Sequence, residues 1–153
     1  MGSTSDGSGG KVTMVAAKAT RQFQATAEAV FDAWLDPELA RHWFAPGLGE
    51  MTRIEIDGRV GGTFWLVQRR EAGDAVHTGE YLEVDRPRRL VFTWQTPPSP
   101  DTSRIIIEIK RLDDGCEATV THEMAPEWES FKERASSAWR TMMNAIATLV
   151  EPR

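Results

Sequence analysis

Three histidines and one tyrosine are the side chains of this sequence best suited to acid–base chemistry. The histidines, His42, His77 and His122, are isolated from one another along the chain, and Tyr81 is the only tyrosine. Histidine exchanges protons near neutral pH, and tyrosine carries a polar hydroxyl on an apolar ring. Within one apolar chamber such groups orient a ligand or act as acid or base. The alternative for each histidine is a hydrogen bond to a neighbouring polar group, with no catalytic role.

Motifs that would identify a reaction or a metal are missing from the sequence. His122-Glu123 lacks the second histidine of a zinc-protease helix, and no GxSxG elbow, phosphate loop or dinucleotide-binding loop occurs. The single cysteine, Cys116, has no partner for an internal disulfide or a CxxC pair. We therefore expect no metal, no cofactor and no identifiable catalytic residue, and we favour binding over catalysis.

Charge and hydropathy restrict the partners of the 153-residue chain. The net charge of −5 argues against nucleic acid as the main partner, because such binders usually present a basic surface. No apolar run is long enough to span a membrane, and the cysteine usage suits a cytoplasmic protein. The Gly/Ser-rich start predicts a disordered tail over residues 1–11, followed by a single domain over residues 12–151.

The elements that must position these side chains follow from periodicity and turn residues. A strand is expected over residues 12–23, then a helix capped by Thr26 and ending at Leu35, then a helix that starts at Asp36-Pro37 and ends near Trp43. Short turns separate the strands that follow, which makes them antiparallel neighbours in a meander. These strands are expected at residues 51–56, 63–70, 75–84, 89–96, 103–112 and 117–124.

The last segment changes its period from two to 3.6, which predicts a helix over residues 128–150 with a length of about 35 Å. Its apolar stripe consists of Trp128, Phe131, Ala135, Ala138, Trp139, Met142, Ile146 and Leu149. A long helix with one apolar stripe and a sheet with one apolar face predict an α+β fold. In this fold the antiparallel sheet curves around the C-terminal helix, and the two short helices cover one end.

A series of short motifs resembles one protein family. In chain order they are Val30-Phe31-Asp32-Ala33-Trp34, Asp36-Pro37-Glu38-Leu39, Trp43-Phe44-Ala45-Pro46, Gly61-Gly62-Thr63-Phe64, Gly79-Glu80-Tyr81-Leu82-Glu83-Val84, Arg89-Leu90-Val91-Phe92-Thr93-Trp94 and Thr119-Val120-Thr121-His122-Glu123. Over about residues 12–150 the chain is similar to the bacterial proteins related to the activator of the ninety-kilodalton heat-shock protein ATPase, in the START-like (SRPBCC) superfamily. The resemblance implies a helix-grip fold with the order β-α-α-β6-α.

The resemblance also implies a deep apolar cavity between the sheet and the long helix. Strand parity places Phe64, Leu66 and Gln68 on its inner side, although the reverse register stays open. The small residues 135–138 of the long helix leave space there, or else they simply permit close packing on the sheet. The expected walls of the cavity are Trp43, Phe44, Phe64, Leu66, His77, Tyr81, Phe92, Trp94, His122, Phe131 and Trp139.

Three functions compete at this point. The first is binding of a small apolar ligand, a lipid or an aromatic metabolite, in this cavity. The second is a co-chaperone-like interaction module that binds a chaperone through an outward Trp65 or the Trp43-Phe44-Ala45-Pro46 loop. Self-association of two copies through an exposed strand also stays open. The third is a cyclase or hydrolase in which His77 or His122 pairs with a carboxylate or with Tyr81.

Overall fold

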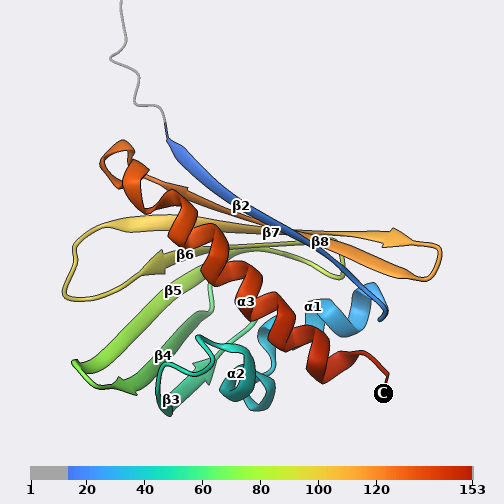
Figure 1. The fold of residues 1–153 in the computed structure, drawn as a ribbon, viewed down its shortest axis with the longest axis horizontal. Helices are drawn as coiled ribbons and strands as arrows, with labels where there is room; N and C mark the ends of the chain where they lie inside the picture. The colour runs from blue at the N-terminus through green and yellow to red at the C-terminus, as the bar shows by residue number, and fades with distance from the viewer. Residues whose placement is uncertain (1–13, 153) are drawn as a thin grey trace, which may run out of the picture.

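The computed structural model describes residues 14–152, which form one antiparallel sheet of seven strands and a long C-terminal helix across it (Figure 1). The tail predicted at residues 1–11 and the predicted strand start at Val12 lie outside the described residues. The strands are β2 (Val15–Phe23), β3 (Glu50–Ile56), β4 (Thr63–Arg70), β5 (Gly73–Asp85), β6 (Arg89–Gln95), β7 (Thr102–Leu112) and β8 (Gly115–Met124). The helices are α1 (Ala27–Leu35), α2 (Pro37–Trp43), the 3₁₀ helix η1 (Pro126–Phe131) and α3 (Lys132–Val150).

The sheet order is β2-β8-β7-β6-β5-β4-β3, so that β3 to β8 form the predicted meander and β2 pairs with β8. Because side chains alternate between the two faces of each strand, the apolar side chains gather on one face of the sheet. Ile105 lies opposite His122 and Ile107 opposite Val120, and both isoleucines are fully buried. The sheet curves around α3, which confirms the predicted α+β helix-grip architecture and its order of elements (Figure 1).

The two short helices begin where their capping residues predict. The Thr26 hydroxyl accepts a hydrogen bond from the backbone N–H of Ala29, at 3.0 Å. The Asp36 carboxylate accepts from the N–H of Glu38 at 2.9 Å, and Pro37 occupies the first position of α2. Both helices contact α3, near its C-terminal half (Figure 1), and so cover one end of the sheet.

The C-terminal helix is shorter than predicted. Residues 126–131 form the 3₁₀ helix η1, and α3 begins at Lys132, which leaves 19 residues with a length of about 28 Å. Trp128 is 38% exposed, so no packing holds this segment in an α-helix that starts at residue 128. None of the helices between residues 14 and 152 combines the length and hydropathy needed to cross a bilayer.

The buried stripe of α3 also differs in part from the prediction. Met143 and Ala147 are buried, whereas Ala138 and Leu149 of the predicted stripe are exposed. Ala138 and Leu149 lie at the edge of the helical stripe, so their side chains project to the side of the contact between α3 and the sheet. The buried positions are Ala135, Trp139, Met142, Met143, Ile146 and Ala147.

Candidate functional site

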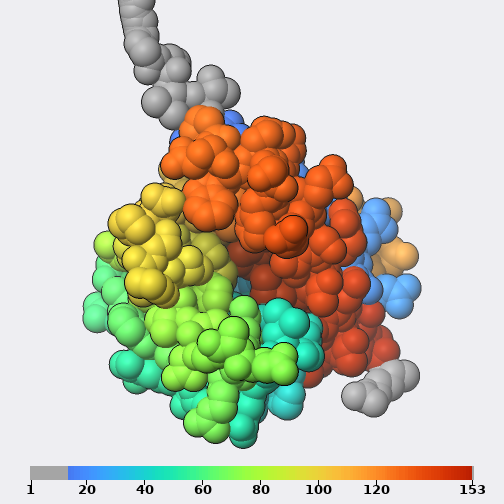
Figure 2. All heavy atoms as spheres, turned by 60° about the vertical axis from the view of Figure 1, so that its left-hand side comes forward, coloured from blue at the N-terminus to red at the C-terminus, as the bar shows by residue number. Residues whose placement is uncertain are grey.

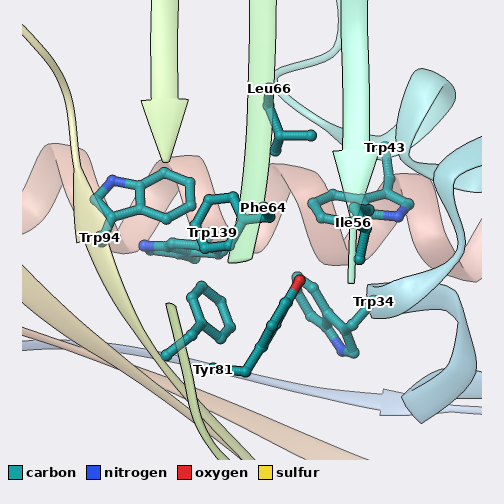
Figure 3. A pocket seen from close by; sticks show the side chains of 9 residues that line it. Trp34, Trp43, Ile56, Phe64, Leu66, Tyr81, Trp94 and Trp139 are labelled. Atoms are coloured by element: carbon teal, nitrogen blue, oxygen red, sulfur yellow. The ribbon is translucent and has the colours of Figure 1, made fainter. Parts of the chain in front are cut away.

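Aromatic rings fill the inner end of the space between the sheet and α3, beside α1 and α2. Trp34 and Trp43 meet edge to face with ring centroids 5.0 Å apart (Figure 3). Phe64 meets Phe92 in the same way at 5.5 Å. The void that remains is about 20 Å³, which is room for a single water molecule. We call this the inner aromatic cluster; its lining residues are Trp34, Trp43, Ile56, Phe64, Leu66, Tyr81, Phe92, Trp94 and Trp139.

A larger hollow of about 450 Å³ lies at the opposite end, against the N-terminal half of α3. We call it the cleft. Figure 2 shows the hollowed face, between the start of α3, the β6–β7 loop and the β4–β5 turn. Its lining residues are Phe44, Ala45, Pro46, Leu48, Arg70, His77, Trp94, His122, Phe131, Arg134, Ala135, Ala138, Trp139, Thr141 and Met142.

A side pocket of about 260 Å³ adjoins the cleft below the β6–β7 loop. The two hollows share His77, Trp94, His122 and Phe131. The side pocket is more polar, because its lining includes Thr96, Ser99, Asp101, Thr102 and Ser103. The cleft and the side pocket therefore offer a ligand a continuous apolar wall with polar groups at one side.

The predicted wall residues are shared between the two spaces, and Trp94 and Trp139 line both. The cleft brings together Phe44, His77, Trp94, His122, Phe131 and Trp139. The inner aromatic cluster holds Trp43, Phe64, Leu66, Tyr81 and Phe92, and it leaves them no space for a ligand. The space for a ligand is therefore the cleft, which lies nearer the surface than the cavity that the sequence pattern indicates.

His122 is held on both sides of its ring by hydrogen bonds. The indole N–H of Trp139 donates to Nδ1 of His122 at 3.1 Å, and Nε2 lies 2.8 Å from the hydroxyl of Ser103. Because an indole nitrogen only donates, Nδ1 must accept, and the ring proton is on Nε2. The hydroxyl of Ser103 in turn donates to the carbonyl oxygen of Trp94 at 3.3 Å. His122 therefore connects α3 to the sheet as a neutral ring, and burial lowers its pKa to about 4.

His77 differs from His122, because its Nδ1 is buried and has no hydrogen-bond partner among residues 14–152. The ring lies between Phe44 and Trp94, with centroid distances of 4.9 and 5.0 Å. Burial lowers the pKa of His77 to about 4, and the positive charge of Arg70 contributes to the shift. His77 is consequently neutral at pH 7, and the ring lines the cleft with its unsatisfied Nδ1 buried behind the wall.

The acid–base pairs of the enzyme hypothesis are not formed in the described part of the chain. His122 contacts Trp139 and Ser103 rather than a carboxylate, and Tyr81 lies in the inner aromatic cluster, away from the cleft. Burial raises the pKa of the Tyr81 hydroxyl, which keeps it protonated. Over residues 14–152, His, Cys, Asp and Glu side chains form no group of three that could hold a metal ion.

One anchor of the interaction-module hypothesis is also wrong. Trp43 and Phe44 are 5% and 2% exposed, because the loop after α2 folds inward against the cleft and the cluster. The indole N–H of Trp43 donates to the carbonyl oxygen of Ala33 at 2.8 Å. Trp65 points outward as predicted, on the face of β4 opposite Phe64 and Leu66.

Two arginines of the cleft were missed by sequence reasoning. Arg70 lies two positions after Gln68 on β4. The alternation that turns Phe64, Leu66 and Gln68 inward therefore turns Arg70 inward as well, and this signal was available in the sequence. Arg134 precedes the small residues of α3 by one position. Ala45 and Pro46, which were expected in a protein-binding loop, line the cleft together with Leu48.

The comparisons with known proteins identify the family. The sequence matches the family described as "Activator of Hsp90 ATPase homolog 1-like protein" over residues 24–151, and the chain belongs to this family. A comparison with curated proteins finds no match.

Solved structures with the same fold come from several bacteria. A protein from Chromobacterium violaceum is 24% identical with a TM-score of 0.80, over 90% of this chain and 98% of that one. A protein from Nitrosomonas europaea is 23% identical with a TM-score of 0.77, over 88% and 93%. A Staphylococcus aureus protein described as of unknown function is 16% identical with a TM-score of 0.77, over 92% and 98%. At these identities the likeness shows the fold alone.

Proposed function

We propose that this protein binds a small, largely apolar molecule in the cleft between the sheet and the N-terminal half of α3. The observation that carries the proposal is the cleft itself, at about 450 Å³. This volume lies within the range of about 300–1,000 Å³ that is usual for small-molecule sites. A lipid chain or an aromatic metabolite of moderate size matches it.

The chemistry of the cleft walls supports the same class of ligand. Trp94 and Trp139 form an aromatic wall with ring centroids 5.2 Å apart, and Phe131 and Met142 add apolar surface. Both histidines of the cleft are neutral at pH 7, so their rings do not repel an apolar group. Burial of ligand carbon against such walls contributes about 25 cal/mol per Å² of apolar surface.

The test is a thermal-shift and titration series with a variant that fills the cleft. Ala138 is exposed and lines the cleft, so Ala138→Trp places an indole in the space without removing a packed side chain. Ser137→Trp, one position earlier and outside the lining, is the matched control. We expect decanol and 2-naphthaleneethanol to raise the Tm of the wild type and of Ser137→Trp, but not of Ala138→Trp.

Two outcomes would contradict the proposal. One is a Tm that neither compound changes in the wild type at concentrations up to their solubility. The other is an equal Tm increase in Ala138→Trp and Ser137→Trp, which would place binding elsewhere. Native mass spectrometry of the protein as purified adds an independent readout, because a copurified molecule would appear as a fixed mass increment.

Docking to an Hsp90-type chaperone is a second candidate function. The name of the matching family and the exposed Trp65 favour it. The guanidinium of Arg53 stacks 4.8 Å from the Trp65 ring centroid, which gives this face an aromatic and cationic contact pair. Binding to a purified bacterial Hsp90, measured for the wild type and Trp65→Ala, tests it; equal affinities or no binding would count against it.

A further inference from the structure

The charged groups of the cleft have one sign. Arg70 and Arg134 line it, and no Asp or Glu of the described chain does. The one carboxylate of the adjoining side pocket, Asp101, accepts a hydrogen bond from the indole N–H of Trp128 at 3.2 Å. The whole protein carries a net charge of −5, so the charged residues of the cleft, which are all cationic, have the sign opposite to that of the protein as a whole. Coulombic attraction at such a site favours a ligand with a negative group.

The side chain of Arg70 is oriented by a buried residue. Its Nε donates a hydrogen bond of 2.7 Å to Oε1 of Gln68, which is 1% exposed. Nε2 of Gln68 donates to the carbonyl oxygens of Ala45 at 3.0 Å and Gly49 at 3.3 Å, so that the loop after α2 fixes the amide. The two terminal nitrogens of Arg70 keep their donors for another acceptor.

Arg70 also differs from the paired arginines of the surface. Arg86 forms a bidentate ion pair with Asp32, and Arg89 pairs with Glu83 and Glu108. Arg70 is half-buried, yet it has no ion pair with a carboxylate of residues 14–152. Burial of this unpaired guanidinium lowers its pKa, which records an electrostatic cost. A bound anion would offset that cost.

His77 is a second polar residue of the same wall: its Nδ1 is buried behind the wall, whereas its Nε2 is not buried and forms no hydrogen bond with residues 14–152. His77 and Arg70 both line the cleft, and the charge of Arg70 is close enough to affect the histidine ring. In the tautomer with its proton on Nε2, the neutral ring donates one hydrogen bond. A carboxylate that accepts from Nε2 of His77 and from the guanidinium of Arg70 would provide a partner for both groups.

We propose that the ligand is an amphipathic carboxylate, with its head group bound by Arg70 and His77 and its apolar body lying along Trp94 and Trp139. This inference rests on the proposed function of the cleft and specifies the class of ligand. Arg134, exposed at the start of α3, supplies a second positive charge at the opening. Gln68 is a positioning residue, because it acts on the head group only through Arg70.

The test compares acids with alcohols of the same skeleton. Decanoate and decanol form the aliphatic acid–alcohol pair. 2-Naphthylacetate and 2-naphthaleneethanol form the aromatic pair. Titrations followed by the fluorescence of the tryptophans give the ratio of Kd for the alcohol to Kd for the acid. We expect this ratio to fall at least about tenfold in Arg70→Gln for the acid that fits, because charge-assisted hydrogen bonds are lost.

Arg69→Gln is the matched control, since Arg69 is adjacent on β4, exposed and absent from the cleft. It should keep the ratio of the wild type. Arg70→Lys keeps the charge but loses the contact geometry with Gln68. Its ratio should lie between those of the wild type and Arg70→Gln. Arg134→Gln should lower the ratio by a few-fold, and its exposed position makes it a safe second variant if Arg70→Gln is unfolded.

The outcomes separate this inference from the proposed function. If Arg70→Gln is folded and its ratio equals that of the wild type for both pairs, the carboxylate assignment is overturned while binding of the alcohols still supports the cleft. If Arg69→Gln and Arg70→Gln lower the ratio equally, only general charge is involved and the assignment also fails. If neither acid nor alcohol binds the wild type, both proposals fail.

Discussion

The ring of Phe64 lies directly over Gly79 on the neighbouring strand. A Cβ added to Gly79 would come within 2.6 Å of the Phe64 ring and would overlap the carbonyl oxygen of Thr93. The absence of a side chain on β5 thus lets Phe64 fill the centre of the sheet, against Tyr81 and Phe92. This contact is one reason why the inner aromatic cluster is closed and the open space lies at the other end.

Gly79→Ala should therefore destabilise the protein. Overpacking in a well-filled region typically costs about 1–3 kcal/mol, and the backbone oxygen of Thr93 leaves little room for adjustment. Urea unfolding of the wild type and the variant measures the change in the free energy of unfolding. The cost should be smaller in a Phe64→Leu background, because the shorter side chain relieves part of the overlap. Equal costs in both backgrounds would show that the ring is not involved.

The stability of the protein should depend on pH through the two histidines of the cleft. The pKa of His77 and of His122 is about 4 in the folded state, below the ordinary value of 6.5. Between pH 6.5 and 4 the unfolded chain therefore binds protons that the folded chain does not. The resulting contribution to stability is complete above pH 6.5, and it is lost as the pH falls toward 4, by about 1.4 kcal/mol per pH unit for each histidine.

Urea unfolding at several pH values checks this dependence. His77→Phe should reduce the slope of stability against pH in that interval. A wild-type stability that stays level from pH 6.5 to 4.5 would contradict the assignment of two neutral, buried rings.

The hydrogen bond from Trp139 to His122 should contribute measurably to the attachment of α3. Trp139→Phe removes the donor and leaves the buried Nδ1 of His122 without a partner. Loss of a partner for a buried polar group costs about 1–3 kcal/mol. Trp128→Phe is the control, because the indole N–H of Trp128 bonds Asp101 in an exposed position, at 3.2 Å. Its effect should stay within about 0.5 kcal/mol; similar losses in both variants would contradict a specific role of His122.

The fold could be predicted from the sequence because its signals are local. Thr26 and Asp36 mark helix starts by their capping chemistry, and the turns between the strands are short and rich in glycine and proline. The start of α3 could not be placed, because Trp128 and Phe131 continue the apolar periodicity of α3, although tertiary packing buries no residue of η1. Local patterns do not report such packing.

The candidate site was predictable only in part, for a related reason. Strand parity tells which side chains face α3, and it correctly places Phe64, Leu66 and Gln68 inward. It does not tell how rings from different strands interlock, so the filled and the open ends could not be distinguished. Arg70 was missed because an arginine at the end of a strand usually lies in solvent, although strand parity places it inward and its contact with Gln68 orients it.

The most direct test of the proposed cleft is a ¹H–¹⁵N spectrum of the indole N–H groups during a titration with decanol. The sequence contains six tryptophans, whose signals single Trp→Phe variants assign. Binding in the cleft predicts shifts for Trp94 and Trp139, with little change for Trp34 and Trp43 of the inner aromatic cluster or for the outward Trp65. Unchanged signals of Trp94 and Trp139 at saturating decanol, or shifts confined to Trp65, would contradict it.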